Sequence, residues 1–229
     1  MPTEPRQIPL DIRLNASFTF DNFYHKKNII DTVRDLIKTP DILILHGMAA
    51  AGKTHLLQAF CNNLPSGDFI YIPGKKFARL DPGLLAVAYK YICIDDFDYL
   101  LGDTEREKLL FDIYNQTVDA NSCLLLSSLP GKLTSTLPDL ESRLGKTRTI
   151  NLELLDDTGK AKAFLLKAQS LGINVDKKII NFIQTHYSRN LHKMMYLLDQ
   201  LEKYSLRYKR KITVPVVKQV MGQTNPNTH

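Results

Sequence analysis

The segment from Gly47 to Thr54 reads Gly-Met-Ala-Ala-Ala-Gly-Lys-Thr and has the residue types of a phosphate-binding loop. It lies between an apolar run and a helix-like segment, so we expect its backbone N–H groups to converge on phosphate oxygens at a helix N-terminus, where the helix dipole also favours anions. Lys53 is expected to reach the β- and γ-phosphates of a nucleotide, and the Thr54 hydroxyl is expected to bind Mg²⁺. The loop and its context therefore predict a nucleotide phosphate site.

A pair of carboxylates follows this loop about forty residues later, at the end of the segment Tyr-Ile-Cys-Ile-Asp-Asp over 91–96. At the end of a buried strand, Asp95 is expected to hold the Mg²⁺ shell and Asp96 to orient or activate a water molecule. Adjacent acids after a strand also serve as helix caps or surface residues. Their position after a phosphate-binding loop favours the magnesium role. A kinase, a GTPase, a helicase and an AAA+ module all remain open at this point.

The elements that must position these residues alternate along the chain. Residues 26–38 place apolar side chains at helical spacing and end before Pro40. Short apolar runs separated by helix-like stretches predict strands at 42–45, 69–72, 91–94, 123–126 and 149–152. Because near-continuous apolar strands that alternate with helices are typical of a buried parallel sheet, we expect an α/β fold.

The pattern changes near Leu154. Helical patterns follow at 158–171, 177–186 and 191–206, and a last short helix is expected near Pro215. We therefore expect a leader over 1–16, an α/β core over 17–153, an all-α domain over 154–221 and a mobile tail over 222–229. The net charge is +6, and residues 154–221 alone hold thirteen basic and five acidic residues. This excess suggests either a nucleic-acid face or the solvated side of a helical bundle.

Composition excludes several classes of protein. Of the 229 residues, 44% are hydrophobic and 24% are charged, which is typical of a globular chain. No apolar run approaches the ~18 residues of a membrane span, and the first residues lack the apolar stretch of a secretory signal. We therefore expect a cytoplasmic protein without a membrane partner. Cys61, Cys93 and Cys123 have no metal-like spacing and are expected to be reduced core residues.

Further segments resemble the AAA+ region of the bacterial replication initiator DnaA and its relatives. They are Asp-Asp-Phe-Asp-Tyr-Leu over 95–100, Phe-Asp-Ile-Tyr-Asn over 111–115, Leu-Pro-Asp-Leu-Glu-Ser-Arg-Leu over 137–144, and Phe-Thr-Phe-Asp-Asn-Phe over 18–23 with Asn28. The resemblance extends from about residue 7 to 221 and is strongest to the regulatory inactivators of DnaA within this family. It implies an AAA+ P-loop core with a five-stranded parallel sheet, followed by a small all-α lid.

The resemblance also implies roles for individual side chains. Arg143 matches the arginine finger, which reaches the γ-phosphate of a neighbouring subunit and stabilises transition-state charge. Phe23, together with Phe18 and Phe20, is expected to help build the adenine-side pocket. At the end of the fourth strand, Ser127 or Ser128 is expected to contact phosphate. His192 occupies the position usually held by the sensor 2 arginine, and Arg189 and Lys193 are the alternatives for that role.

The site residues expected from these arguments form three sets. The nucleotide-binding set is Gly47, Gly52, Lys53, Thr54, His55, Phe23, Asp95, Ser128 and His192. Thr54 and Asp95 are the expected Mg²⁺ ligands, and Arg143, acting in trans, and Asp96 are the expected catalytic residues. ADP or ATP with Mg²⁺ is the expected cofactor.

The leader contains a third kind of signal. Gln-Ile-Pro-Leu-Asp-Ile over 7–12 is similar to the peptide with which replication proteins enter the pocket of the DNA polymerase sliding clamp. An extended segment stiffened by proline can offer Ile8 and Leu10 as apolar anchors and Gln7 as an orienting hydrogen-bonding group. The resemblance therefore implies clamp binding through Gln7, Ile8 and Leu10.

The resemblance therefore implies a regulatory inactivator of DnaA. Such a protein docks on the DNA-loaded clamp, contacts DNA through it at the nucleoid, and promotes hydrolysis of the ATP bound to DnaA. Leu129 stands where relatives often carry an acid, so we expect weak ATPase activity at most, and homo-oligomers are possible.

The alternative is a DNA-associated adaptor or loader that uses the basic helical domain. Its cluster is Lys203, Arg207, Lys209, Arg210 and Lys211, interleaved with Tyr204 and Tyr208. A self-sufficient P-loop enzyme, such as a small-molecule kinase, is disfavoured because no acceptor site is visible.

Overall fold

The computed structural model describes residues 14–79, 89–131 and 133–224. The chain separates into two compact units. The core unit extends to Phe20 and continues over Lys27–Glu153, and the helical unit combines Asp21–Lys26 with the chain from Leu154 onward. Among the described residues, no helix combines the length and the apolar character needed to span a bilayer.

The core unit is built on one parallel sheet of five strands in the order β2-β3-β4-β1-β5. Its strands are β1 (Ile42–Gly47), β2 (Phe69–Pro73), β3 (Tyr91–Asp95), β4 (Cys123–Ser128) and β5 (Arg148–Leu152). The parallel α/β core and all five predicted strands are confirmed. Because all strands run in the same direction, the loops that follow β1, β3 and β4 meet at one edge of the sheet.

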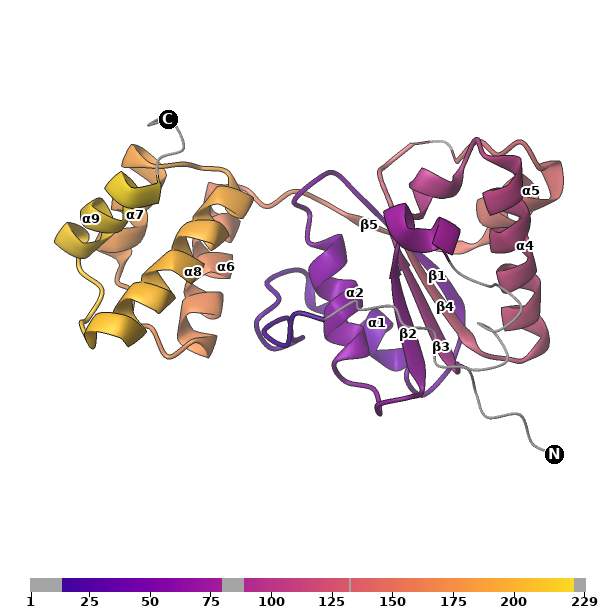
Figure 1. The fold of residues 1–229 in the computed structure, drawn as a ribbon, viewed down its shortest axis with the longest axis horizontal. Coiled ribbons are helices and arrows are strands. Elements are labelled where there is room, and N and C mark those ends of the chain that lie inside the picture. Colours follow the sequence, from indigo (N-terminus) through magenta and orange to yellow (C-terminus); the bar gives the residue numbers. More distant parts are fainter. Residues whose placement is uncertain (1–13, 80–88, 132, 225–229) are drawn as a thin grey trace. The chain divides into compact units, whose positions relative to one another are not determined.

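Helices cover both faces of this sheet (Figure 1). On one face lie α1 (Lys27–Asp35) and α2 (Lys53–Cys61), and on the other lie α4 (Thr104–Asp119) and α5 (Pro138–Lys146). Alternate strand residues point to opposite faces, and Ile44, Ile92 and Leu126 share one buried cluster with Leu110 and Ile113 of α4. The described residues of this unit also contain two short 3₁₀ helices, η1 (Gly74–Arg79) and η3 (Phe97–Leu100).

The helical unit contains α6 (Asp157–Ser170), α7 (Lys177–His186), α8 (Leu191–Tyr208) and α9 (Val214–Thr224). Three of them begin at a polar cap, since the side chains of Asp156, Asp176 and Asn190 accept hydrogen bonds from first-turn N–H groups. The apolar faces of these helices meet in a second core that includes Phe164 and Ile183. The four helices lie close to the predicted segments, because their apolar spacing and their caps are local signals.

Candidate nucleotide-binding site

The loop between β1 and α2 is a tight turn around the start of α2. Ala50 and Gly52 have left-handed backbones, with φ of 68° and 96°. A Cβ atom on Gly47 would lie 2.9 Å from Ala51 Cβ and 3.0 Å from the Leu152 carbonyl oxygen. Only glycine fits where the loop leaves β1, so the first glycine of the motif sets the close packing of the loop against β5.

The start of α2 is suited to an anion. Gly52 is its N-cap and supplies no side-chain acceptor, so the first-turn N–H groups lack a side-chain cap. The Lys53 ammonium is buried and donates to the carbonyl oxygens of Gly47, at 2.7 Å, and Met48, at 3.4 Å. Thr54 is exposed in the first turn. Uncapped amides, a lysine held at the loop and an adjacent hydroxyl together fit a phosphate group with Mg²⁺.

Asp95 ends β3 at the same edge of the sheet and is almost fully buried. Both of its carboxylate oxygens accept hydrogen bonds from neutral hydroxyl groups. The Tyr71 hydroxyl donates to Oδ2 at 2.7 Å, and the Ser127 hydroxyl donates to Oδ1 at 2.5 Å. Neither Tyr71 nor its contact with Asp95 was predicted from the sequence. A single carboxylate supplemented by substrate phosphates is a common way to hold Mg²⁺, so the donor set fits this ion.

Asp96 adopts a left-handed backbone conformation with φ of 51°, and its amide donates to the Ser127 hydroxyl at 2.8 Å. Burial and repulsion from Asp95 raise the pKa of the Asp96 carboxyl group, although Lys53 opposes the shift. The turn approaches η1 so closely that a Cβ atom on Gly74 would lie 2.3 Å from the Asp96 carbonyl oxygen. Ser127 and Gly74 therefore fix the orientation of the two acids.

Arg143 lies in the last turn of α5 and is exposed. Its guanidinium lies over two aromatic rings of α4, at 5.2 Å from the Phe111 centroid and 5.6 Å from the Tyr114 centroid. Within the described parts of the chain, the structure gives Arg143 no carboxylate partner. The side chain is therefore held by ring faces, and its N–H donors are not committed to an internal ion pair.

Solved structures share this arrangement of elements. Domain III of the Thermotoga maritima replication initiation protein DnaA matches with a TM-score of 0.76 at 21% identity, covering 93% of this chain and 98% of that chain. AMPPCP-bound DnaA from Aquifex aeolicus matches with a TM-score of 0.69 at 19% identity, covering 86% of this chain and 71% of that chain. At these identities the likeness shows the fold.

Sequence comparison is more specific. A family model described as "Hda, lid domain" matches residues 157–221. An uncharacterized protein from Haemophilus influenzae is 32% identical over an alignment of 229 positions. The alignment covers 95% of this chain and 99% of that protein. This chain belongs to the Hda family of DnaA-related AAA+ proteins. The family that the sequence motifs indicated is thereby confirmed.

At the end of β4, this Hda-family chain brings Ser127, rather than Ser128, into contact with the two acids. The Ser128 hydroxyl lies 2.7 Å from His46 Nδ1, at the end of β1, and also donates to the Leu129 carbonyl oxygen. Burial lowers the pKa of His46. His46 was not predicted as part of the site. Its pairing depends on the register of β1 with β4, which no local sequence pattern reveals.

Other predicted residues of the Hda-family site have different surroundings. His55 stacks on Phe18, with ring centroids 4.5 Å apart, and its Nε2 lies 3.0 Å from the Thr19 carbonyl oxygen. Phe20 is buried in the core unit beneath the Arg34 guanidinium. Phe23 is buried in the helical unit. The three predicted phenylalanines are therefore divided between the two units. Gln7, Ile8 and Leu10 lie outside the described residues.

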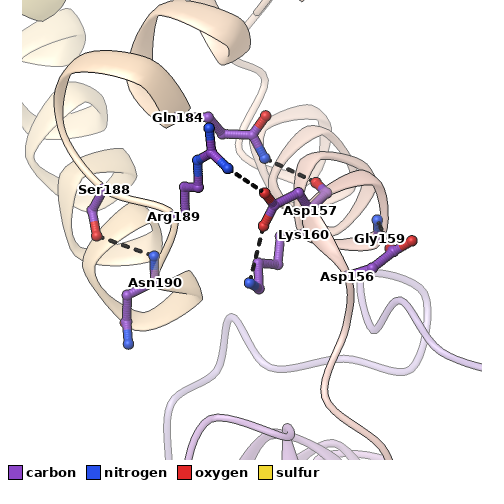
Figure 2. A network of polar contacts seen from close by, with 8 residues as sticks. All are labelled: Asp156, Asp157, Gly159, Lys160, Gln184, Ser188, Arg189 and Asn190. Carbon is purple, nitrogen blue, oxygen red and sulfur yellow. Dashed lines mark hydrogen bonds and ion pairs between the residues drawn. The ribbon is translucent and has the colours of Figure 1, made fainter.

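In this chain, the segment predicted to hold sensor 2 takes part in a polar network around Asp157 (Figure 2). The Asp157 carboxylate pairs with Arg189 and with Lys160, each at 3.2 Å, and Gln184 donates to the Asp157 carbonyl oxygen at 2.8 Å. Arg189 therefore ties the segment before α8 to the start of α6. His192, one of the predicted nucleotide ligands, is exposed in the first turn of α8.

Proposed function

We propose that this chain is a nucleotide-binding regulator of DnaA that promotes hydrolysis of the ATP bound to DnaA. The observation that carries the proposal is Arg143, an exposed arginine at a helix end that rests on the Phe111 and Tyr114 rings and has no carboxylate partner among the described residues. An arginine finger needs a side chain that is oriented but still able to bind phosphate. Membership of the Hda family supports DnaA as the protein that receives it.

The chain's own nucleotide, in this proposal, is ADP or ATP. The loop amides and Lys53 bind the phosphates, and Thr54 and Asp95 hold Mg²⁺, which neutralises phosphate charge. The DnaA structure solved with AMPPCP supports nucleotide binding, because it shares this fold. A ligand that binds only the folded protein stabilises it by RT ln(1 + [L]/Kd). We therefore assign a structural role to the nucleotide.

Hydrolysis by the chain alone is proposed to be weak. Leu129, the residue that follows β4, is half exposed and uncharged, where relatives often carry an acid. Residues 7–12 are proposed to bring the chain to the sliding clamp, with DNA contacted through the clamp.

The decisive experiment measures ATP hydrolysis by DnaA. DnaA is loaded with labelled ATP, and conversion to ADP is followed with this chain, with and without clamp assembled on DNA. We expect stimulation that requires both the chain and the DNA-loaded clamp. Hydrolysis at the rate of DnaA alone would refute the regulatory function. Stimulation that does not need the clamp would remove the leader from the proposal.

A second candidate function follows from the cationic end of α8. Five basic residues here are exposed and form no ion pair with the described residues: Lys203, Arg207, Lys209, Arg210 and Lys211. The last three line a hollow of about 510 Å³ between the loops that follow α6 and α8. Such unpaired charge favours direct contact with a nucleic-acid backbone.

This alternative is tested by fluorescence anisotropy of labelled duplex DNA without clamp, over a range of salt concentrations. Charge reversal of Lys209 and Lys211 should weaken binding and flatten its salt dependence. Reversal of Lys177 and Lys178, which are exposed on α7, is the matched control. Equal effects of the two double variants, or no binding by the unmodified chain, would reject the alternative.

A further inference from the structure

The contact between Tyr71 and Asp95 follows from the pairing of β2 with β3. Tyr71 pairs with Cys93, so Asp95 is its diagonal neighbour two residues further along β3. Residues two apart on a strand share a face, and a diagonal neighbour is within reach of a long side chain. The Tyr71 hydroxyl therefore reaches the carboxylate from the neighbouring strand, although 24 residues separate the two in sequence.

A tyrosine at this position does more than fill space. The side chain is buried, and burial together with the Asp95 charge raises the pKa of the Tyr71 hydroxyl far above its ordinary value. The hydroxyl therefore remains protonated and acts as a donor. Hydrogen bonds from a neutral donor to a carboxylate are stronger and shorter than bonds between neutral groups, so this contact restricts the orientation of Asp95.

A second residue, Gln58 of α2, acts on Tyr71. The Asn15 backbone N–H donates to Gln58 Oε1 at 2.8 Å. This bond assigns the oxygen of the amide to Asn15 and leaves the NH₂ group for another acceptor. Gln58 opposes the rise in the pKa of the Tyr71 hydroxyl, as expected of a side-chain NH₂ group close to the phenolic oxygen. Hydrogen bonds thus connect Asn15 to Gln58 and Tyr71 to Asp95.

Gln58 belongs to a polar stripe on α2. His55, Gln58 and Asn62 are spaced three and four residues apart and so lie on one face of the helix. All three bind the backbone of the segment 15–19, and Asn62 donates to the carbonyl oxygens of Asn15 and Phe18. The helix that begins at the phosphate-binding loop thus holds this segment, and among these three residues Gln58 also acts on the pKa of Tyr71.

We propose that the Tyr71 hydroxyl, with Gln58 acting on it, positions the Asp95 carboxylate for the divalent cation. Tyr71 and Gln58 are positioning residues, since neither is placed to touch the nucleotide, and the proposal rests on the proposed nucleotide site. Groups that hydrogen-bond a metal-binding carboxylate fix its orientation, and their loss costs about 10- to 100-fold in metal affinity.

The test uses the full chain loaded with ADP, with Mn²⁺ as the probe and electron paramagnetic resonance to measure free Mn²⁺. Tyr71→Phe should weaken Mn²⁺ binding about tenfold. ADP affinity measured in EDTA should stay within twofold. Tyr91→Phe is the matched control, because the Tyr91 hydroxyl is likewise buried but donates to the Ile37 carbonyl oxygen, at 2.9 Å. It should lose similar thermal stability and keep its Mn²⁺ affinity.

Gln58 is tested in the same way. Gln58→Met keeps the length of the side chain and should also weaken Mn²⁺ binding, whereas Asn62→Ala, which loosens only the segment 15–19, should not. Unchanged Mn²⁺ affinity in Tyr71→Phe, or equal losses in Tyr71→Phe and Tyr91→Phe, would overturn the positioning role. Equal effects of Gln58→Met and Asn62→Ala would remove Gln58 from it. An unmodified chain that binds no ADP at all would instead overturn the proposed nucleotide site, and the inference with it.

Discussion

The guanidinium of Arg143 lies over the ring of Phe111, with Cζ 5.2 Å from the ring centroid. The two residues come from α5 and α4, so packing between these helices sets the position of the arginine. A cation over a ring face is stabilised by about 0.5–1 kcal/mol at an exposed site. That energy is enough to favour one orientation of the side chain and small enough for the guanidinium to leave the ring when a phosphate is available.

Removal of the arginine is the direct test of its role. Arg143→Ala should keep ADP binding and clamp binding and should lose the stimulation of ATP hydrolysis by DnaA, because the cation that stabilises transition-state charge is absent. Labelled ATP bound to DnaA provides the measurement. Arg106→Ala removes a partly exposed arginine of α4 that pairs with Asp103, and it is the matched control. Full stimulation by Arg143→Ala would exclude the finger role.

The Phe111 ring beneath the arginine should contribute less to the stimulation of DnaA than Arg143 itself does. Phe111→Leu keeps an apolar side chain in the partly buried position but removes the ring face. We expect stimulation of DnaA to fall about two- to fivefold, which corresponds to the 0.5–1 kcal/mol of the cation–ring contact. The same hydrolysis assay measures the effect, with circular dichroism as the folding control. A loss as complete as that of Arg143→Ala, in a folded protein, would contradict a purely orienting role.

Clamp docking is tested in the leader. Gln7→Ala should weaken binding of the full chain to purified clamp, because the glutamine amide is expected to orient the peptide while Ile8 and Leu10 supply the apolar anchors. Titration calorimetry measures the affinity, and Thr3→Ala, outside the 7–12 segment, is the control. An affinity equal to that of the unmodified chain would exclude the glutamine from docking.

Local sequence patterns predicted most of the fold. Four of the five strands are short apolar runs, whereas β5 mixes polar and apolar residues. The helices of the helical unit have apolar spacing, and three of them have polar caps, so their type and place followed from the sequence. The position at which α1 ends did not follow from the sequence. Periodicity predicted a helix to residue 38, but the helix ends at Asp35 and Leu36 and Ile37 form hydrogen-bonded turns. Buried turns keep apolar residues, so spacing alone cannot mark the end of a helix.

The residues of the candidate site also divide into those that local sequence patterns predicted and those that they missed. Lys53, Thr54 and Asp95 were found because their signal lies within a few consecutive residues. Tyr71, Gln58 and His46 were missed because each acts on a partner from another element, and only the strand register and helix packing bring them together. A hydroxyl-bearing ring inside the apolar run Phe-Ile-Tyr-Ile-Pro over 69–73 was the available signal for Tyr71.

The partly buried histidine beside Ser128, His46, predicts a pH dependence of stability. The pKa of His46 is lowered from its ordinary 6.5, chiefly by burial, with Lys53 acting in the same direction and Asp98 against it. The unfolded chain therefore binds this proton more readily than the folded chain, and stability falls as pH falls below about 6.5 towards the lowered pKa. Melting temperatures at pH 7.5, 6.5 and 5.5 should decrease in that order.

His46→Asn should reduce this pH dependence, because the variant side chain has no proton to gain. His192→Asn, at an exposed position of α8, should leave it as in the unmodified chain. If His46→Asn and the unmodified chain lost the same melting temperature between pH 7.5 and 5.5, the histidine would not be the group responsible.

Two glycines should respond in opposite directions to the same substitution. A Cβ atom on Gly74 would lie 2.3 Å from the Asp96 carbonyl oxygen, and backbone atoms cannot yield as a flexible side chain does. Gly74→Ala should therefore destabilise the protein by about 1–3 kcal/mol and displace the turn that carries the two acids.

Gly145, within α5, has open space around its Cβ position. Gly145→Ala should stabilise the protein by about 0.5–1 kcal/mol, because alanine loses less backbone freedom in a helix. Urea unfolding measures both values. A Gly74→Ala variant as stable as the unmodified chain would show that η1 can move away from Asp96 without cost, and the close approach would then not fix the orientation of the acids.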